Sequence, residues 1–396
     1  MRVLLINKFL HPVGGSETVF FQEWAWLEAA GHEVIPFGMT HPNNVASPYQ
    51  SYWAPQIDYA RPTPGQLVSL IWSRAAARQL KALALATRPD VAHLHNVYHQ
   101  LSPAIIAVLR QLRIPTVLTA HDYKLVCPNY RLYTQGQICS RCVGSHPWHA
   151  LRHRCLKSSW SASALAAVET GVHRWLRAYA GIDQLIAPSH FLKTMLQRGG
   201  WRLAQITTLP HAIALPPPAT TAKPAAILFA GRLVPEKGVT WLLAAARRLP
   251  DIPFRIAGTG PLWRVAAPAN VTWLGHLSPA ELAAEYAAAR AMVAPSLWYE
   301  LFGMSALEAM SHGCPVIASR MGALPELVAH EQTGLLVAPG EVEELAAAIA
   351  RLWRDADLAA RLGRAAQTHV RAHHDPADHL TRLLQLFTQL RQPIKT

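Results

Sequence analysis

The chain has 396 residues, 51% of them hydrophobic, which is enough to bury the cores of two domains. This excludes a disordered linker, a small disulfide-stapled scaffold and a single helical bundle. The formal net charge of +13 favours contact with something anionic, such as nucleic acid, an acidic membrane face or a phosphorylated ligand, and does not choose among them.

The positive charge is unevenly distributed along the chain. Residues 1–212 contain 20 Lys and Arg against 9 Asp and Glu, whereas residues 213–396 contain 17 against 15. No segment approaches the ~18 consecutive apolar residues of a membrane span. The apolar run at the start of the chain is too short, and is followed too early by polar residues, for the hydrophobic region of a secretory signal. We therefore expect a cytoplasmic protein whose five cysteines do not form structural disulfides.

Short apolar runs alternate with amphipathic stretches in the first half. We expect strands at 2–6, 33–37, 91–94, 115–119 and 184–187. Helices are expected near 17–30, 66–87, 102–112, 158–179 and 189–198. This alternation, with continuous apolar strands, is typical of a doubly wound parallel sheet.

The second half repeats the same rhythm. We expect strands at 226–230, 253–257, 271–274, 291–294 and 315–318, and helices near 238–248, 279–289, 303–312 and 341–366. The proline-rich residues 213–224 predict a stiff, extended linker. The fold class is therefore α/β with two Rossmann-like domains, 1–212 and 225–375, followed by a C-terminal helical segment, 376–396.

The strongest functional motif follows the predicted strand 291–294. A loop there carries Glu300, and a helix that begins around Phe302 and Gly303 carries Glu308 on its second turn. The free amides at a helix start, with the positive end of the dipole, favour an anion. Two carboxylates beside such an anion site suit hydroxyl groups, as on a sugar ring or a ribose.

A second motif follows the predicted strand 226–230. The chain runs into Gly231 and then presents Arg232 and Lys237 on the loop before the next helix. Two cations at the carboxyl end of a parallel strand can hold a diphosphate. A plain surface loop is an equally good interpretation of this motif alone, and the carboxylate motif decides for the ligand site.

Together these residues carry a resemblance to a known family. Arg232 and Lys237, followed some 60 residues later by Glu300 and Glu308, resemble the retaining glycosyltransferases of family 4, which have the GT-B fold. Four further segments match that family's pattern: the glycine loop with Gly14 and Gly15, the strand-end His121, the loop with Gly258 and Gly260, and residues 274–277. The resemblance covers essentially the whole chain in the right order.

The resemblance implies a hexosyltransferase that uses a nucleoside diphosphate sugar, with UDP or GDP as the nucleotide, and no catalytic metal. Arg232 and Lys237 would hold the diphosphate and stabilise the leaving group, Glu308 would bind the ribose and Glu300 the donor sugar. His121 would contact the donor sugar near the reacting carbon. The remaining donor-binding residues that it implies are Gly14, Gly15, Gly231, Gly258, Gly260, Phe302, Gly303 and Met304. The C-terminal helix 376–390 would cross back to pack on the first domain.

Four of the five cysteines lie in one segment of the first half, about 123–157. Cys127, Cys139, Cys142 and Cys155 can supply four tetrahedral ligands to a structural zinc ion. An iron–sulfur cluster and free buried thiols remain open alternatives. Similar cysteine-bearing inserts occur in some family 4 relatives associated with surface polysaccharide synthesis, and this insert is expected to lie at the acceptor side of the cleft.

The acceptor implied by this pattern is a lipid-linked sugar or a polysaccharide. Basic and aromatic residues of the cysteine-bearing segment, among them Arg152, Arg154, Trp148 and Trp160, suit the anionic inner face of the cytoplasmic membrane, although a solvated loop would also explain them. A GT-B relative such as a sugar epimerase is an alternative, but it would lack Glu300 and Glu308 in this arrangement. A zinc-dependent nucleic-acid-binding protein would leave both carboxylates unexplained, so no nucleic acid partner is expected.

Overall fold

The computed structural model describes residues 1–57, 63–216 and 226–391. Its first sheet is parallel throughout, in the order β2-β1-β3-β4-β7-β8. The strands are β1 (Arg2–Ile6), β2 (Glu33–Phe37), β3 (Val91–Leu94), β4 (Thr116–Thr119), β7 (Gln184–Ala187) and β8 (Ile206–Thr208). The edge strand β8, only three residues long, was not predicted from the sequence.

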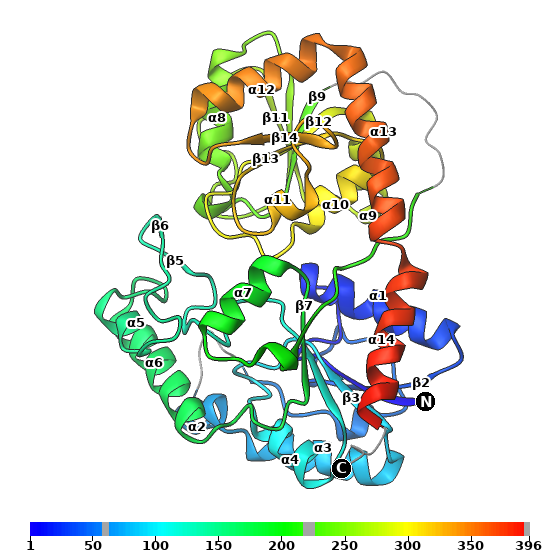
Figure 1. The fold of residues 1–396 in the computed structure, drawn as a ribbon. Coiled ribbons are helices and arrows are strands. Elements are labelled where there is room, and N and C mark those ends of the chain that lie inside the picture. Colours follow the sequence, from blue (N-terminus) through cyan, green and yellow to red (C-terminus); the bar gives the residue numbers. More distant parts are fainter. Residues whose placement is uncertain (58–62, 217–225, 392–396) are drawn as a thin grey trace.

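The second sheet is also parallel throughout, in the order β11-β10-β9-β12-β13-β14. Its strands are β9 (Ala226–Ala230), β10 (Phe254–Ala257), β11 (Val271–Gly275), β12 (Ala289–Ala294), β13 (Val316–Ser319) and β14 (Gly334–Val337). The edge strand β14 was missed in the sequence. The two doubly wound sheets give the α/β architecture that the strand and helix pattern predicted (Figure 1).

Helices cover both faces of the first sheet. They are α1 (Gly15–Ala29), α2 (Pro64–Ile71), α3 (Arg74–Thr87), α4 (Ala104–Gln111), α6 (Trp160–Trp175) and α7 (His190–Arg198). The single helix expected at 66–87 is wrong, because Trp72 is extended and Ser73 caps α3 through the amide of Ala76. The cysteine-bearing segment contains a small hairpin, β5 (Tyr133–Thr134) and β6 (Gln137–Ile138), and the short helix α5 (His149–Arg152).

The helices of the second domain are α8 (Val239–Arg248), α9 (Pro279–Ala288), α10 (Met304–Ser311), α11 (Leu324–Leu327), α12 (Val342–Arg354) and α13 (Ala356–His373). The continuous helix expected at 341–366 is wrong as well. Asp355 has an extended backbone and its carboxylate accepts a hydrogen bond from the amide of Leu358, so it ends α12 and caps α13. Among the described helices none is both long and apolar enough to cross a bilayer.

The last helix, α14 (Pro376–Arg391), follows α13 down to the first domain and lies beside α1 (Figure 1). Leu383, Leu386 and Phe387 of α14 are buried in the core of the first sheet. The last residues of the chain, 392–396, and residues 217–224 of the expected linker lie outside the described residues.

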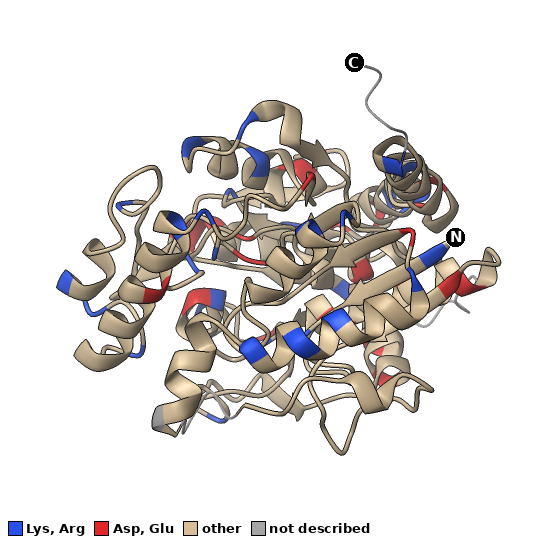
Figure 2. Cartoon of the chain, turned by 90° about the horizontal axis from the view of Figure 1, so that it is seen from below, with Lys and Arg blue, Asp and Glu red and all other residues tan. Residues whose placement is uncertain are grey.

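Lys and Arg are spread over several helices and loops in the view from below (Figure 2). Several of them follow one another along a single helix at the front of that view.

Candidate functional site

The first part of the candidate site lies where β9 ends. Gly231 follows β9, and Arg232 is exposed to solvent. Within the described part of the chain, the Arg232 guanidinium makes no hydrogen bond or ion pair with protein. A free guanidinium at the carboxyl end of a parallel strand is available to a phosphate.

Lys237 and Glu300 form an ion pair that the sequence did not predict. Lys237 ends the short helix η3 (Pro235–Lys237), and its Nζ lies 2.7 Å from Glu300 Oε1. The Ser296 hydroxyl donates a second hydrogen bond to the same oxygen. The side chain of Glu300 is 8% exposed, and that of Lys237 is 21% exposed. The Lys237 side chain is therefore partly accessible from the solvent.

The charge state of Glu300 follows from these partners. Burial acts to raise the pKa of Glu300, but the charge of Lys237 and the hydrogen bonds from Lys237 and Ser296 outweigh burial, so this pKa lies below its ordinary value. Glu300 is therefore a carboxylate at neutral pH, with Oε1 committed to Lys237 and Ser296.

The helix start that the carboxylate motif predicted is one residue later than expected, at Met304. Gly303 precedes α10 with a φ of 102°, a conformation that favours glycine. The first amides of α10 have no acceptor within the helix, and together with the helix dipole they favour binding of an anion.

The ring of Phe302, just before this helix, packs between the rings of His211 and His374, with centroids at 5.0 and 5.6 Å.

The glycine loop of the first domain lies directly against this helix start. Gly14 is the N-cap residue of α1, and a Cβ placed on Gly15 would lie 3.9 Å from Met304 Cγ. The starts of α1 and α10, which belong to different domains, therefore face one another. The structure thus brings together two segments that the sequence separates by almost 290 positions.

Glu308 lies on the second turn of α10, as predicted. Its Oε2 accepts a hydrogen bond of 2.9 Å from the Tyr286 hydroxyl of α9. Burial raises the pKa of Glu308, and the Tyr286 hydrogen bond opposes that rise only in part. No basic side chain is hydrogen-bonded to Glu308 in the described residues, so its acceptor capacity is open to hydroxyl donors.

Gly258 and Gly260 have a structural reason to be glycine. A Cβ on Gly258 would lie 1.8 Å from the carbonyl oxygen of Gly231, and one on Gly260 would lie 2.5 Å from that of Leu233. The loops after β9 and β10 are packed backbone to backbone, and the Leu233 amide donates to Thr259 O over 2.9 Å. These two glycines therefore shape the loop that carries Arg232.

His121, two residues after β4, faces a row of histidines. Its Nε2 lies 2.9 Å from His95 Nδ1, and its ring stacks on His211 at 5.5 Å. Burial and the neighbouring imidazoles hold the pKa of His121 well below its usual range, so this ring is neutral at neutral pH. His211 links His121 to Phe302 and was not singled out in the sequence.

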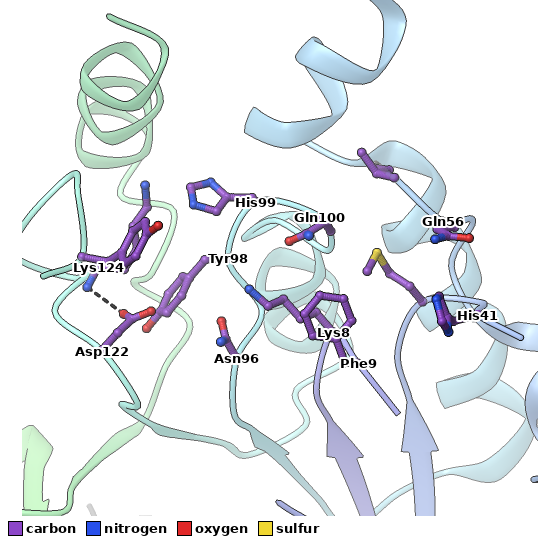
Figure 3. A pocket seen from close by; sticks show the side chains of 13 residues that line it. Lys8, Phe9, His41, Gln56, Asn96, Tyr98, His99, Gln100, Asp122 and Lys124 are labelled. Carbon is purple, nitrogen blue, oxygen red and sulfur yellow. Dashed lines mark hydrogen bonds between the residues drawn. The ribbon is translucent and has the colours of Figure 1, made fainter. Parts of the chain in front are cut away.

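A pocket of about 550 Å³ opens at the carboxyl ends of the first sheet (Figure 3). Strand-end residues Lys8, Asn96, Tyr98, Asp122 and Lys124 line it. They were not predicted from the sequence, because each follows its strand singly, without a motif. Their position after β1, β3 and β4 was the signal that could have found them.

Burial shifts the pKa of two charged side chains in the pocket, Asp122 and Lys8. Burial raises the pKa of Asp122 to about 6. The backbone amide of Lys124 donates a hydrogen bond of 2.8 Å to the Asp122 carboxylate, which opposes this rise only in part. Burial also lowers the pKa of Lys8. Lys124 is held by Glu169 at 2.7 Å and does not reach into the pocket as a free cation. The pocket therefore combines polar and charged groups with apolar side chains such as Phe9 and Ile57.

The cysteine-bearing segment borders the cleft through its first residues. Tyr130 lines the pocket of the first domain, and Arg131 forms an ion pair of 3.1 Å with Glu236, next to Lys237. Cys127, Cys139, Cys142 and Cys155 line one small cavity with Asn129, His149 and Ala150. Among the described residues, no three of these sulfurs lie within 4.8 Å of one another. The sulfurs are therefore spaced more widely than a bound zinc ion would hold them.

Several hydrogen bonds hold the two domains together around the site. Ser189 Oγ donates to Leu301 O over 2.7 Å, and the Tyr123 hydroxyl donates to Tyr299 O over 3.2 Å. The Glu326 carboxylate accepts from the amides of His190 and Phe191 at the start of α7, at 2.7 and 2.6 Å. The loop that carries Glu300 is thus fixed against the first domain on both sides.

Two family models match the chain. The model described as "Glycosyltransferase Family 4" matches residues 13–215, and the model described as "Glycosyl transferases group 1" matches residues 224–355. The glycogen synthase of Mycobacterium tuberculosis is 30% identical over 98% of this chain and 94% of its own length. An MMP alpha-(1->4)-mannosyltransferase of Mycolicibacterium hassiacum is 38% identical over 35% of this chain and 36% of its own.

Solved structures agree on the fold. Sucrose-phosphate synthase of Thermosynechococcus elongatus superposes with a TM-score of 0.71 at 23% identity over 98% of both chains. Anabaena HepE in complex with UDP-glucose superposes with a TM-score of 0.66 at 18% identity over 98% of this chain and 100% of its own. These likenesses confirm the expected GT-B arrangement of two Rossmann-like domains.

Proposed function

The chain belongs to the family 4 glycosyltransferases, and we propose that it moves a hexosyl residue from a nucleoside diphosphate sugar to a lipid-linked or polysaccharide acceptor, with retention of the anomeric configuration. One observation carries this proposal. Arg232 and Lys237 lie on the loop after β9, Lys237 is paired with Glu300 of the loop after β12, and the starts of α1 and α10 face one another.

The donor diphosphate would lie among these positive groups. Arg232 and Lys237 would bind its oxygens, and the amides of Phe302, Gly303 and Met304 would face the phosphates and the sugar. Gly231 would let the phosphates approach the loop, and Gly14 and Gly15 would let the first domain do the same. As the glycosidic bond breaks, both cations would stabilise the charge that develops on the diphosphate, the task that a metal ion performs elsewhere.

The donor sugar and ribose would contact the carboxylates and His121. Glu308, open to hydroxyl donors, would bind the ribose, and Glu300 Oε2 would bind sugar hydroxyls while Oε1 stays on Lys237. The acceptor hydroxyl would attack the anomeric carbon on the face from which the diphosphate departs. Its proton would pass to the departing phosphate oxygen, so that the step needs no protein nucleophile.

The pocket of the first domain would receive the acceptor. Its volume of about 550 Å³ is within the range of small-molecule sites. Asn96, Tyr98, Gln100 and Asp122 offer hydrogen-bond donors and acceptors suited to a hydroxyl-rich sugar. His121 lies next in sequence to Asp122, which would connect the acceptor pocket with the donor site.

The proposal is tested by measuring the melting temperature of the full chain with UDP, GDP, ADP and their common sugars. We expect one nucleotide to raise the melting temperature, because ligand that binds only the folded state stabilises it by about 2.7 kcal/mol at 100 times its dissociation constant. Glu308→Ala should abolish most of the shift. Arg371→Ala, which removes an exposed guanidinium from α13, is the matched control and should keep it. No shift with any nucleotide, together with no sugar transfer, would contradict the proposal.

We also propose that the four cysteines of the first domain hold a structural zinc ion. The donor set fits zinc, since four sulfurs line one cavity, and thiolate sulfur is a preferred zinc ligand. A bound zinc ion would draw the four sulfurs together. Its positive charge would also oppose the effect of burial, which raises the pKa of the Cys142 thiol to about 12.

Removal of this zinc with a chelator should lower the melting temperature by about 5 °C or more, because a bound structural metal contributes directly to the folding free energy. Cys142→Ser should lower the zinc content by one ion per chain. Cys314→Ser, which changes a buried cysteine of the second domain, should keep the metal content of the wild type. Equal zinc in all three proteins would show that the cysteines bind none.

Peripheral binding to an anionic membrane is the last part of the proposal. Trp148, Trp160 and Trp175 are 53%, 57% and 82% exposed, and they lie on or next to the neighbouring helices α5 and α6. Trp160 and Trp175 are separated by close to a whole number of helical turns, so they lie on one side of α6. Arg154 stacks on Trp160 at 5.5 Å, and such a basic, aromatic surface suits a membrane interface.

In a sedimentation assay, the chain should bind phosphatidylglycerol vesicles and bind pure phosphatidylcholine vesicles more weakly. Trp175→Ala should weaken this binding about tenfold, because the indole loses its burial in the interface. Leu85→Ala, which removes another exposed apolar side chain, from α3, should have no effect. Binding that is independent of lipid charge and of Trp175 would contradict the membrane proposal.

A further inference from the structure

A cluster of polar side chains is buried in the first domain, beside the residues assigned to donor binding. Glu23 Oε2 lies 3.3 Å from His93 Nδ1 and 3.4 Å from His95 Nε2. The three side chains are at most 2% exposed. None of these three atoms has a hydrogen-bond partner, and together they form a group of potential metal ligands within 4.8 Å of one another.

The fold explains why these residues meet. His93 lies in β3 and His95 directly after it, and residues two apart on an extended strand point to the same face of the sheet. Glu23 lies on the buried side of α1, the helix that covers this face. The helix α14 lies beside α1 and adds His379, whose Nε2 is 3.1 Å from Glu23 Oε1 (Figure 1).

The second nitrogen of each histidine and the second carboxylate oxygen of Glu23 are fixed by hydrogen bonds. His93 Nε2 is hydrogen-bonded to Thr119 Oγ1 at 2.8 Å, and His95 Nδ1 to His121 Nε2 at 2.9 Å. His379 fixes the second carboxylate oxygen of Glu23 and is itself bonded to Pro210 O at 2.9 Å. Metal-binding histidines are oriented in this way, by a hydrogen bond at the nitrogen that does not bind the ion.

The separations at the centre fit a metal ion better than direct hydrogen bonds. The two contacts of Glu23 Oε2 are longer than ordinary hydrogen bonds to an imidazole. Ligand atoms about 2.0–2.1 Å from a tetrahedral ion lie about 3.3 Å from one another. A carboxylate buried without a charged partner is also costly, and a cation among the three atoms would remove that cost.

We propose that Glu23, His93 and His95 bind a divalent transition-metal ion of the zinc class. Two imidazole nitrogens and one carboxylate oxygen are a donor set that zinc accepts, with one further position for water. The ion lies between α1 and β3, and His379 joins α14 to it through the carboxylate of Glu23. It is distinct from the proposed cysteine site in both location and ligand chemistry.

The ion would also position His121. A metal on His95 Nε2 leaves the proton of that ring on Nδ1, which then donates to His121 Nε2. His121 itself is not a ligand, and its role toward the donor sugar rests on the proposed function, whereas metal binding by the three residues does not.

Cobalt(II) tests the site in the full chain without reference to sugar transfer. Cobalt bound at this site should give visible d–d absorption without the near-ultraviolet charge-transfer band of a cobalt thiolate. Any cobalt bound by the cysteines would add its own thiolate signal to this absorption. Glu23→Gln and His93→Gln should each weaken this sulfur-free binding about 100-fold or more, since loss of even an indirect partner costs 10–100-fold. His173→Gln is the matched control, because His173 is a buried histidine of the same domain that bonds Ile71 O instead.

A second measurement on the wild type covers the case in which the variants do not fold. Zinc K-edge absorption of the zinc-saturated chain should require nitrogen or oxygen scatterers at about 2.0 Å in addition to any sulfur. A spectrum that sulfur alone explains would overturn the proposal. Folded Glu23→Gln and His93→Gln proteins whose cobalt spectra and affinities match those of the wild type would overturn it as well.

Discussion

Replacement of Arg232 by Ala is expected to lower kcat of sugar transfer by about 10²–10³-fold, the effect of removing one preorganised group that stabilises developing charge. Arg232 is exposed and has no partner in the described residues, so nothing in the fold depends on it. The melting temperature without ligand should therefore stay within about 2 °C of the wild type. Transfer rates at saturating donor, alongside thermal melting, check both parts.

Two further variants sharpen this result. Arg232→Lys keeps the charge but loses the planar fork that binds two phosphate oxygens, so it should recover only part of the rate. Arg371→Ala removes an exposed guanidinium far along the chain, on α13, and should leave kcat unchanged. Full activity of Arg232→Ala would remove Arg232 from the donor site, whatever the behaviour of Lys237.

Much of the fold and of the candidate site could be predicted because strands and the loops after them are local features. The apolar runs before Gly231 and before Glu300 mark β9 and β12, and functional side chains at the carboxyl ends of such strands follow directly. The breaks at Trp72 and Asp355 could not be predicted from helical periodicity, since it continues on both sides of each break. Capping by Ser73 and Asp355 ends that continuity.

Contacts between distant segments depend on strand order, which the sequence does not show. Lys237 meets Glu300 because β9 and β12 are neighbours in the sheet, although β10 and β11 lie between them in the chain. His95 meets His121 because β3 pairs with β4. The approach of Gly15 to Met304 depends further on how the two domains face each other. The sequence singled out Lys237, Glu300 and His121 together with Gly15 and Met304, but not their partners, and it did not single out His95.

The ion pair of Lys237 and Glu300 gives the second large effect, and here stability and activity change together. Lys237→Ala would leave a buried carboxylate without its cation. We expect a loss of about 2–3 kcal/mol at pH 7, below the range for a fully buried pair because Lys237 is 21% exposed. kcat should also fall by about 10²–10³-fold, because the second cation of the diphosphate site is gone. Thermal melting and transfer rates measure the two losses separately.

The pH dependence distinguishes this explanation from simple loss of packing. In the wild type the pKa of Glu300 is lowered, so its stabilising contribution is present above the unfolded value of 4.5 and is lost as the pH falls through the folded value. In Lys237→Ala, burial without the cation raises this pKa, and protonation on acidification relieves the buried charge. The stability difference between the two proteins should therefore shrink as the pH falls from 7 to 4. A difference that stays constant would mean that lost packing, and not the charge of Glu300, causes the destabilisation.

The double variant Lys237→Met, Glu300→Gln separates the two roles of the pair. It removes both charges while keeping the size of each side chain, and replacing a buried pair in this way is often neutral for stability. We expect its melting temperature to return to near that of the wild type while transfer remains as low as in Lys237→Ala or lower. Recovery of transfer together with stability would show that the pair only supports the fold. Recovery of stability alone would place Lys237 and Glu300 in the reaction itself, with the ion pair holding the carboxylate ready for the donor sugar.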